Sequence, residues 1–164
     1  DIKINERRGP RPGMLRISKL TDYAILAMVE LTTHREAVLS AQALAERCGL
    51  EAPTVSKVLK ALVRADLVES FRGANGGYRA RSAPERVSIA AVIDAIEGPI
   101  AMTECSVHEG LCTVEASCSA RENWQKVSRA VADALERVSL ADMSRPADNA
   151  IAPPTGLEIA TLNA

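Results

Sequence analysis

Residues 40–81 read SAQALAERCGLEAPTVSKVLKALVRADLVESFRGANGGYRAR and carry the main signals for the fold. Ser40 is a preferred helix N-cap and Gly49 is a preferred residue just past a helix end, so we expect a helix of about two turns between them. Pro53 suits the first turn of a second helix. Two short helices joined by a tight turn that contains glycine are typical of a helix-turn-helix.

The second of these helices has one apolar face and one polar face. Its apolar residues recur at the spacing of a buried helical stripe and are Val55, Val58, Leu59, Leu62 and Val63. The opposite face is polar and basic, as in a recognition helix that enters the major groove of DNA. We expect Thr54, Ser56 and Lys57 to lie at base edges. Lys60 and Arg64 are expected at phosphate or groove positions.

A basic hairpin is predicted directly after the recognition helix. The runs LVESFR and YRAR are strand-like, and the turn GANGG at 73–77 between them tolerates positive φ at several positions. A hairpin in this place acts as a wing that reaches phosphates or the minor groove, so we expect Arg72, Asn75 and Arg79 to contact DNA. The sequence therefore predicts a mainly α protein with a winged helix-turn-helix domain and a β-hairpin wing.

Amphipathic helices are predicted on both sides of this core. A largely buried helix over 21–34 is expected to begin with Thr21 as its N-cap, and a helix over 88–97 is expected to stop at Gly98. A long helix is predicted over about 121–143. Its apolar residues follow the spacing of a coiled-coil seam and are Trp124, Val127, Val131, Leu135 and Val138. A long helix that protrudes from a small domain has nothing of its own to pack against, so these residues are predicted to form a homodimer.

Composition changes along the chain divide it into segments. The opening residues are polar and contain no hydrophobic period, and Met14 is a candidate for the natural first residue. The closing residues are rich in Ala, Pro and small polar side chains, which is typical of disorder. The expected segments are a disordered extension at 1–13, a winged helix-turn-helix domain at 14–98, a cysteine loop at 99–119, a dimerisation helix at 120–143 and a disordered tail at 144–164.

Charge is unevenly distributed over the 164 residues. The segments 1–13, 14–81 and 82–164 carry net charges of +2, +3 and −6. A basic front half indicates that a polyanion would bind there. Aromatic residues make up only 2% of the chain, which argues against a stacking surface for single-stranded nucleic acid. No apolar run approaches the roughly 18 residues of a membrane span, so we expect a cytoplasmic protein without membrane contact.

Three of the four cysteines, Cys105, Cys112 and Cys118, fall within fourteen residues, with His108 among them. In a reducing compartment such a group favours a metal or redox site over a disulfide framework. The three thiolates can hold zinc with His108 as the fourth ligand, hold an iron–sulfur cluster with a fourth ligand from elsewhere, or stay unligated. Cys48, at the end of a short helix, is expected to be a small buried residue rather than a ligand.

Signals for catalysis are missing from the sequence. No Ser/His/Asp set, phosphate-cradling loop or pair of carboxylates is recognisable, so we expect that the protein is not an enzyme. A thiol–disulfide enzyme is disfavoured further because the chain has no CxxC motif.

Several motifs together resemble the Rrf2 family of bacterial winged-helix regulators. These are MLRISKLTDYA, the helix-turn-helix, FRGANGGYRAR, the stop AIEGP and a three-cysteine loop before a long helix. The resemblance covers about residues 14–143. A narrower likeness, in APTVSKVLK, FRGANGGY, MTECSVHEGLC and the RENW that follows, is to the branch of regulators named for the SUF iron–sulfur assembly operon.

This resemblance implies a homodimer that binds a palindromic promoter site in double-stranded DNA. It also implies an iron–sulfur cluster, [2Fe–2S] or [4Fe–4S], held by Cys105, Cys112 and Cys118. The protein would then be a cluster-sensing transcriptional regulator that controls the SUF operon. The alternative is a winged-helix DNA-binding regulator that is stabilised by zinc, or contains no metal, and senses no cluster.

The fourth cluster ligand is where the sequence departs from the best-known pattern of the family. Isc-type regulators have a histidine three residues after the last cysteine, and Arg121 stands at that position here. Relatives that sense nitric oxide use an acid of the first helix, donated across the dimer, and Asp22 matches that place. We therefore order the candidates as Asp22, then His108, then Glu122. Asp22 is equally well explained as an acid that the helix dipole favours near a helix N-terminus.

Overall fold

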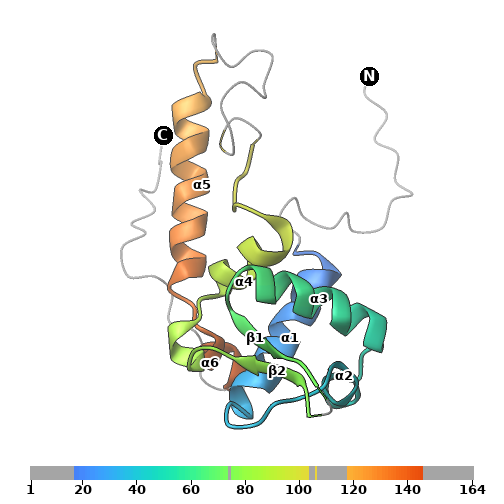
Figure 1. Ribbon diagram of the computed structural model, residues 1–164. Coiled ribbons are helices and arrows are strands. Elements are labelled where there is room, and N and C mark those ends of the chain that lie inside the picture. Colours follow the sequence, from blue (N-terminus) through green and yellow to red (C-terminus); the bar gives the residue numbers. More distant parts are fainter. Residues whose placement is uncertain (1–16, 74, 104–105, 107–117, 146–164) are drawn as a thin grey trace, which may run out of the picture.

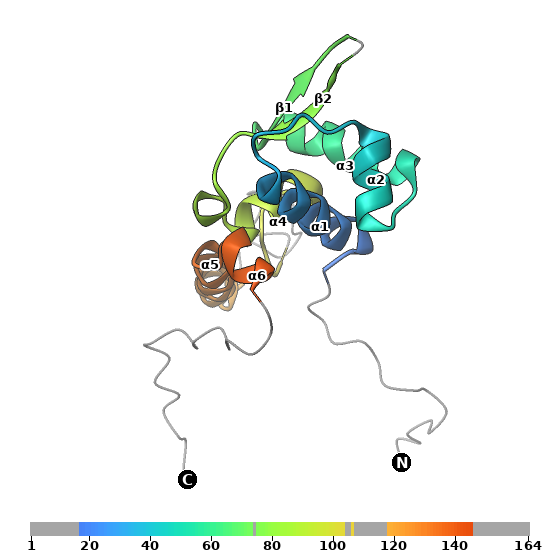
Figure 2. The same ribbon diagram turned by 90° about the horizontal axis from the view of Figure 1, so that it is seen from below.

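A computed structural model describes residues 17–73, 75–103, 106 and 118–145 (Figure 1). Its helices form a small body from which a two-stranded hairpin and one long helix project (Figures 1 and 2). The elements are α1 (Lys19–Thr33), α2 (Ala41–Cys48), α3 (Ala52–Arg64), β1 (Val68–Phe71), β2 (Gly77–Ala80), the 3₁₀ turn η1 (Pro84–Arg86), α4 (Ile89–Glu97), α5 (Arg121–Glu136) and α6 (Leu140–Ser144). None of the helices in these ranges is long and apolar enough to cross a bilayer. The mainly α, winged helix-turn-helix class predicted from the sequence is confirmed.

Helix α1 is the element around which the others pack. It contacts α2, α3, α4, α6 and β2. The helix begins at Lys19 because the side chain of Ser18 accepts a hydrogen bond from the backbone N–H of Thr21 at 3.2 Å. The prediction that Thr21 caps this helix is wrong, since Thr21 lies inside the first turn and is fully buried.

The helix-turn-helix forms at the predicted residues. Ser40 caps α2, and Gly49 ends it in the left-handed region with φ of 65°. In the turn, the backbone N–H of Leu50 donates to the carbonyl oxygen of Ala45 at 2.9 Å. Pro53 lies in the first turn of α3, as expected.

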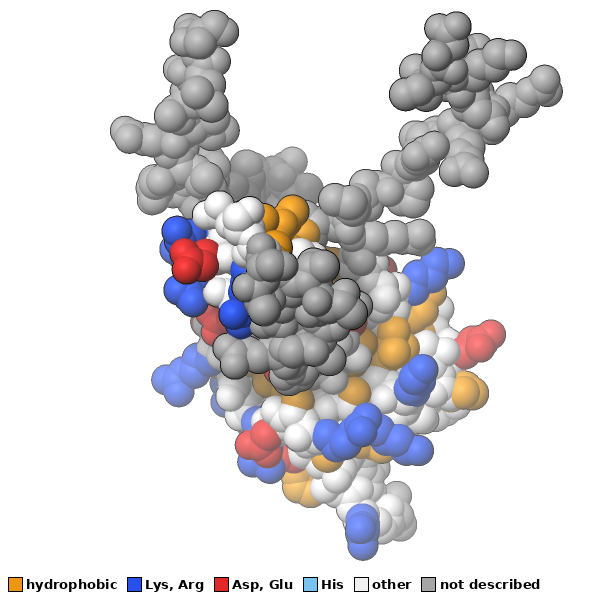
Figure 3. Space-filling view, turned by 90° about the horizontal axis from the view of Figure 1, so that it is seen from above, with side chains coloured by type: hydrophobic (Ala, Val, Ile, Leu, Met, Phe, Trp, Pro, Cys, Tyr) orange, Lys and Arg blue, Asp and Glu red, His pale blue; other side chains and the backbone are white. Residues whose placement is uncertain are grey.

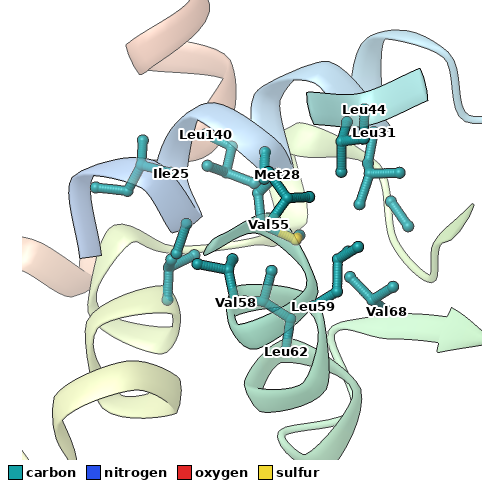
Figure 4. Close-up of a cluster of buried hydrophobic side chains, with 14 of the residues drawn as sticks. Ile25, Met28, Leu31, Leu44, Val55, Val58, Leu59, Leu62, Val68 and Leu140 are labelled. Carbon is teal, nitrogen blue, oxygen red and sulfur yellow. The ribbon is translucent and has the colours of Figure 1, made fainter. Parts of the chain in front are cut away.

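The apolar stripe of α3 packs into the centre of the body. Figure 4 shows Val55, Val58, Leu59 and Leu62 facing side chains of α1 and α6. The side chains that are fully buried include Met28, Leu31, Leu44, Val55, Val58, Leu59, Leu62, Val68, Val92 and Leu140. The predicted stripe is therefore the core face of α3, although Val63 at its edge is only partly buried.

The hairpin is also anchored to the body through the half of β2 that is nearer the hairpin turn. Strands β1 and β2 are antiparallel, and Leu39 of the α1–α2 loop pairs with Tyr78 through two backbone hydrogen bonds of 2.9 and 2.8 Å. A side chain at Gly77 would place its Cβ 2.5 Å from the carbonyl oxygen of Leu39. Glycine at this position therefore lets the loop approach closely, and the wing is joined to both helices of the motif.

The prediction of one helix over 120–143 is wrong, because the structure divides it. Helix α5 ends at Glu136 and α6 begins after Ser139, which forms a capping box with Asp142. The Ser139 backbone N–H donates to the Asp142 carboxylate at 2.9 Å, and the Asp142 backbone N–H donates to the Ser139 hydroxyl at 3.2 Å. Val138 lies between the helices, where its carbonyl oxygen accepts from the backbone N–H of Ile89 at 2.8 Å.

The predictions for the remaining segments have mixed outcomes. Helix α4 stops at Gly98, as the sequence predicts, and Ser88, the first residue of the predicted helix, is its N-cap. The extension at 1–13 and nearly all of the tail at 144–164 lie outside the described residues. Ser144, the first residue of the predicted tail, is instead the last residue of α6.

Candidate nucleic-acid interface

The face of α3 opposite the core carries the predicted DNA-contacting side chains. Lys57, Lys60 and Arg64 are exposed at positions three and four residues apart, so they share one side of the helix. Thr54 and Ser56, near the start of α3, are half-buried. The basic side of α3 is thus free to meet a duplex, with its two small hydroxyl side chains at the N-terminal end.

The hairpin extends the basic surface beyond α3. Arg72 is exposed next to the turn and Asn75 is exposed within it. The turn is closed by a 2.9 Å hydrogen bond from the backbone N–H of Gly76 to the carbonyl oxygen of Gly73. Figure 3 shows Lys and Arg side chains towards the hairpin tip, at the bottom of that view. Arg79 lies on the same hairpin, but its guanidinium forms an ion pair with another side chain of the protein, Glu69, at 3.0 Å.

Most of the predicted metal ligands lie beyond the part of the chain that the structure describes. Cys105, His108 and Cys112 lie outside the described residues, so the predicted cluster site is not tested. Cys118 is described and is half-buried just before α5. Cys48 is also half-buried, and burial, followed by the charge of Glu30, raises the pKa of its thiol. Among the described side chains, no three of the His, Cys, Asp and Glu type lie close enough to hold a metal ion.

The candidate fourth ligands from the helices are both exposed. Asp22 lies in the first turn of α1, and Glu122 lies in the first turn of α5. Both positions are near helix N-termini, where the helix dipole favours an acid without any metal. The structure places the two residues on different helices and does not choose between them.

The cysteine segment is the predicted cysteine loop at 99–119, and both of its described ends contact or adjoin α5. On the side that leaves α4, the backbone N–H of Met102 donates to the hydroxyl of Ser128 at 3.0 Å. Ser128 is the one residue of α5 that is buried. On the side that enters α5, the backbone N–H of Arg121 donates to the carbonyl oxygen of Cys118 at 3.3 Å. Helix α5 is thus the support against which the cysteine segment begins and ends.

Glu97 connects the start of α1 to the end of α4, just before the cysteine segment. Its Oε1 atom accepts from the backbone N–H of Ser18 at 3.1 Å and from the hydroxyl of Thr21. These hydrogen bonds, with that of Thr21 as the largest contribution, lower the pKa of the Glu97 carboxyl. The sequence does not predict this role for Glu97, because an acid at the end of an amphipathic helix gives no local sign of a partner 76 residues away.

Helix α5 presents large apolar side chains to the solvent. Trp124 is 40% exposed and Val127 is 44% exposed, while Val131 and Leu135 are half-buried. Four of the five predicted seam residues therefore lie on α5, and Val138 follows it. On α1, Leu26 is also 44% exposed. A row of apolar side chains on one helix face, as on α5, is typical of a surface that becomes covered by a partner, whereas a single one such as Leu26 is ordinary.

Comparison with known proteins gives a consistent result over this whole region. The model of the Rrf2 family, described as an iron-dependent transcriptional regulator, matches residues 17–146. The chain is 27% identical over 130 residues to the HTH-type transcriptional regulator IscR of Aliivibrio salmonicida, which covers 79% of this chain and 77% of the relative. It is 30% identical over 135 residues to the HTH-type transcriptional regulator CymR of Bacillus subtilis, covering 82% of this chain and 93% of the relative.

Solved structures show the same likeness. The structure of CymR, the global cysteine regulator of B. subtilis, matches with a TM-score of 0.60 and 31% identity over 79% of this chain and 95% of that one. The structure of T. potens IscR matches with a TM-score of 0.58 and 30% identity over 79% of this chain and 85% of that one. Both matches bear out the winged helix-turn-helix fold and the likeness to transcriptional regulators.

Replacing Glu97 tests the connection between α1 and α4. We expect Glu97→Gln to lower the free energy of unfolding by about 1 kcal/mol at pH 7, because an amide accepts weaker hydrogen bonds than a carboxylate. Since folding lowers the pKa of Glu97, its contribution is complete above the ordinary carboxyl pKa and is lost as the pH falls through the folded-state value. Urea unfolding from pH 7 to pH 3 should therefore show the two proteins converging at the acid end.

Asp94→Asn is the control for this measurement, because Asp94 is an exposed acid on the same helix. It should keep the wild-type stability at pH 7. A constant difference between wild type and Glu97→Gln at every pH would contradict a role for the ionised carboxylate.

Proposed function

The chain belongs to the Rrf2 family of DNA-binding transcriptional regulators, and on that premise we propose that it senses an iron–sulfur cluster held by Cys105, Cys112 and Cys118. The spacing of these three thiols directly before α5 carries the proposal. In a homodimer the cluster state would set the distance between two recognition helices, which must meet half-sites about one turn of DNA apart. Operator affinity would then report cluster supply or oxidative damage.

The DNA-binding role is assigned to α3 and the wing. Lys57, Thr54 and Ser56 are proposed to read base edges, because they lie towards the N-terminal end of α3, which enters the groove first in this motif. Lys60 and Arg64 continue the same side of the helix and are proposed to contact phosphates. Arg72, Asn75 and Arg79 would reach the neighbouring backbone or minor groove from the wing.

The donor set suits an iron–sulfur cluster. Three thiolates match the cysteine ligation that such clusters prefer, and Cys118 stands directly before α5, whose Ser128 also holds the other end of the segment. When bound, a cluster supplies iron–thiolate bonds that oxidants and iron shortage break. Cys118 would transmit that change to the start of α5, and Asp22 is proposed as the fourth ligand, given from the partner's first helix.

Control of the SUF operon is the narrowest part of the proposal. It rests on the likeness of APTVSKVLK, FRGANGGY and MTECSVHEGLC to the SUF branch of the family. A second candidate function is a regulator that is stabilised by zinc, or contains no metal, and does not sense a cluster. The residue types favour it in one respect, since Cys105, His108, Cys112 and Cys118 together make the Cys₃His set of structural zinc sites.

A homodimer through α5 is proposed from its exposed apolar residues. Trp124 and Val127 are exposed in the first half of α5. Figure 1 shows this helix projecting from the body. Val131 and Leu135 continue the row at helical spacing. A second copy of the chain would cover these side chains and place two winged domains side by side.

Substitutions on α3 should separate base contacts from phosphate contacts. We expect Lys60→Ala to weaken binding to a SUF promoter fragment and to unrelated duplex alike, and to reduce the slope of log affinity against log salt by about one. Lys57→Ala should cost about 1–3 kcal/mol on the promoter fragment and less on unrelated duplex. Fluorescence anisotropy over a salt series measures both effects.

The control for these variants is Lys126→Ala, since Lys126 is an exposed lysine of α5. It removes the same charge and should leave binding unchanged. Equal losses from all three variants would mean that net charge alone governs binding and that α3 has no special role.

Anaerobic purification followed by a visible spectrum and by iron, sulfide and zinc assays tests the cofactor. We expect a brown protein with iron and sulfide, and a Cys118→Ser variant that has lost most of both. Cys48→Ser is the control, because Cys48 is not among the proposed ligands, and it should stay brown. A colourless protein with stoichiometric zinc would contradict cluster sensing and establish the second candidate.

The oligomeric state can be tested on the same face of α5. Val127→Glu should convert the dimer to a monomer in light scattering, because it places a charge in the apolar contact. Lys126→Glu, at the neighbouring exposed position, should leave the dimer intact. A Val127→Glu protein that remains a dimer would show that the copies associate through another surface.

A further inference from the structure

One face of the wing, here called its outer face, carries Glu69 and Phe71 of β1 and Arg79 of β2, with Arg81 just after β2. Glu69 contacts both arginines. Glu69 of β1 stands directly opposite Arg79 of β2 in the strand register. Its Oε2 atom is 3.0 Å from Nη2 of Arg79, and its Oε1 atom is 3.4 Å from Nη1 of Arg81. Both oxygens of one carboxylate are therefore used by the two basic side chains nearest to the base of the wing.

A second contact fixes the direction of Arg79. Its guanidinium carbon lies 4.9 Å from the centre of the Phe71 ring, within the range of a cation–π interaction. Phe71 is paired with Gly77, two residue pairs nearer the hairpin turn than the Glu69–Arg79 pair, and is 38% exposed. Arg79 thus lies along the outer face, with Glu69 on one side and the Phe71 ring beneath it.

Arg81 is held by a second acid. Its Nε atom is 3.0 Å from Oδ1 of Asp66, a residue in the turn between α3 and β1. Two arginines on this face thus stand against two carboxylates, and the local charge is close to balanced. Arg72 differs, because within the described residues it makes no ion pair with a carboxylate.

We propose that Glu69 is a specificity-determining residue, an internal counter-ion that occupies Arg79 and Arg81 and suppresses the binding of the wing to DNA of arbitrary sequence. The inference rests on the proposed docking of the wing against DNA. A DNA phosphate can bind Arg79 or Arg81 only if it displaces the Glu69 carboxylate or comes close to the negative charge of that carboxylate. That exchange is unfavourable on a loosely placed duplex and becomes favourable where an operator holds the wing close to its backbone.

The strength of the ion pairs suits this role. Glu69, Arg79 and Arg81 are 31%, 39% and 45% exposed, and exposed pairs of this kind add little to folding stability. A wing without Glu69 should therefore still fold, because the strands also pair through their backbones and through Leu39. The charge of Glu69 has a larger effect on DNA affinity than on folding stability. Nonspecific affinity depends on how many Lys and Arg side chains neutralise phosphates.

The test compares Glu69→Gln with Glu136→Gln, which removes the same charge from an exposed position on α5. Each full-length protein is titrated onto a random-sequence duplex and onto a SUF promoter fragment at several salt concentrations. Glu69→Gln should bind the random duplex at least threefold more tightly, steepen its salt slope by about one, and lower the ratio of promoter to random affinity. Glu136→Gln should behave as wild type, and melting curves should show that both variants are folded.

A third variant assigns the gain to the wing arginines. Adding Arg79→Ala and Arg81→Ala to Glu69→Gln should remove the increase in random-duplex affinity. An unchanged or weaker affinity of Glu69→Gln, or an equal increase from Glu136→Gln, would overturn the proposal. A wild-type protein that binds neither duplex would overturn the proposed DNA-binding function itself, which is a separate outcome.

Discussion

Burial of the apolar side of α3 against α1 determines the direction of every basic side chain on the opposite side. Val55, Leu59 and Leu62 have no accessible surface, and Met28 of α1 is equally buried. Emptying a site of this kind by a leucine-to-alanine change costs about 2–5 kcal/mol, whereas an exposed charge pair contributes roughly 0–1 kcal/mol. The core therefore orients α3. Lys57 and Lys60 point outwards because they lie on the side of the helix opposite its buried residues.

The position of the wing is fixed by the elements that this core packs together. Strand β1 follows α3 after a short turn, and β2 is joined to the α1–α2 loop through Leu39 and Tyr78. Because Gly77 lets that loop approach the strand, the hairpin is connected to both helices of the motif and should move with them. Helix α3 and the wing then form one unit, and in the proposed DNA complex the charges of Glu69, Arg79 and Arg81 would adjust its affinity without changing its position.

Local chemistry explains which parts of this arrangement can be predicted from the sequence. Ser40, Gly49 and Pro53 act on neighbouring backbone groups, so their effect is visible in a short window, and the two faces of α3 follow from helical spacing alone. The break after Glu136 was missed because the capping residues Ser139 and Asp142 look like ordinary polar positions in an amphipathic run. Glu97 was missed because its partners are distant in sequence. The cysteine ligands remain a prediction from residue type and spacing.

Two physical connections link the cysteine segment to α3, and they differ in stiffness. Helix α5 leads through Val138 to Leu140, the first residue of α6, which is fully buried in the cluster that contains the α3 stripe. A close-packed core resists displacement of such a residue. The other connection runs through the hydrogen bonds that Glu97 accepts from Ser18 and Thr21 at the start of α1, and α1 packs on α3. Each such hydrogen bond adds only about 1 kcal/mol. The packed core therefore resists a displacement of α3 more strongly than these hydrogen bonds resist a displacement at the start of α1, near Asp22. In the proposed dimer, the state of the proposed cluster would therefore act on the spacing between two copies of the winged domain and leave the fold of each copy unchanged.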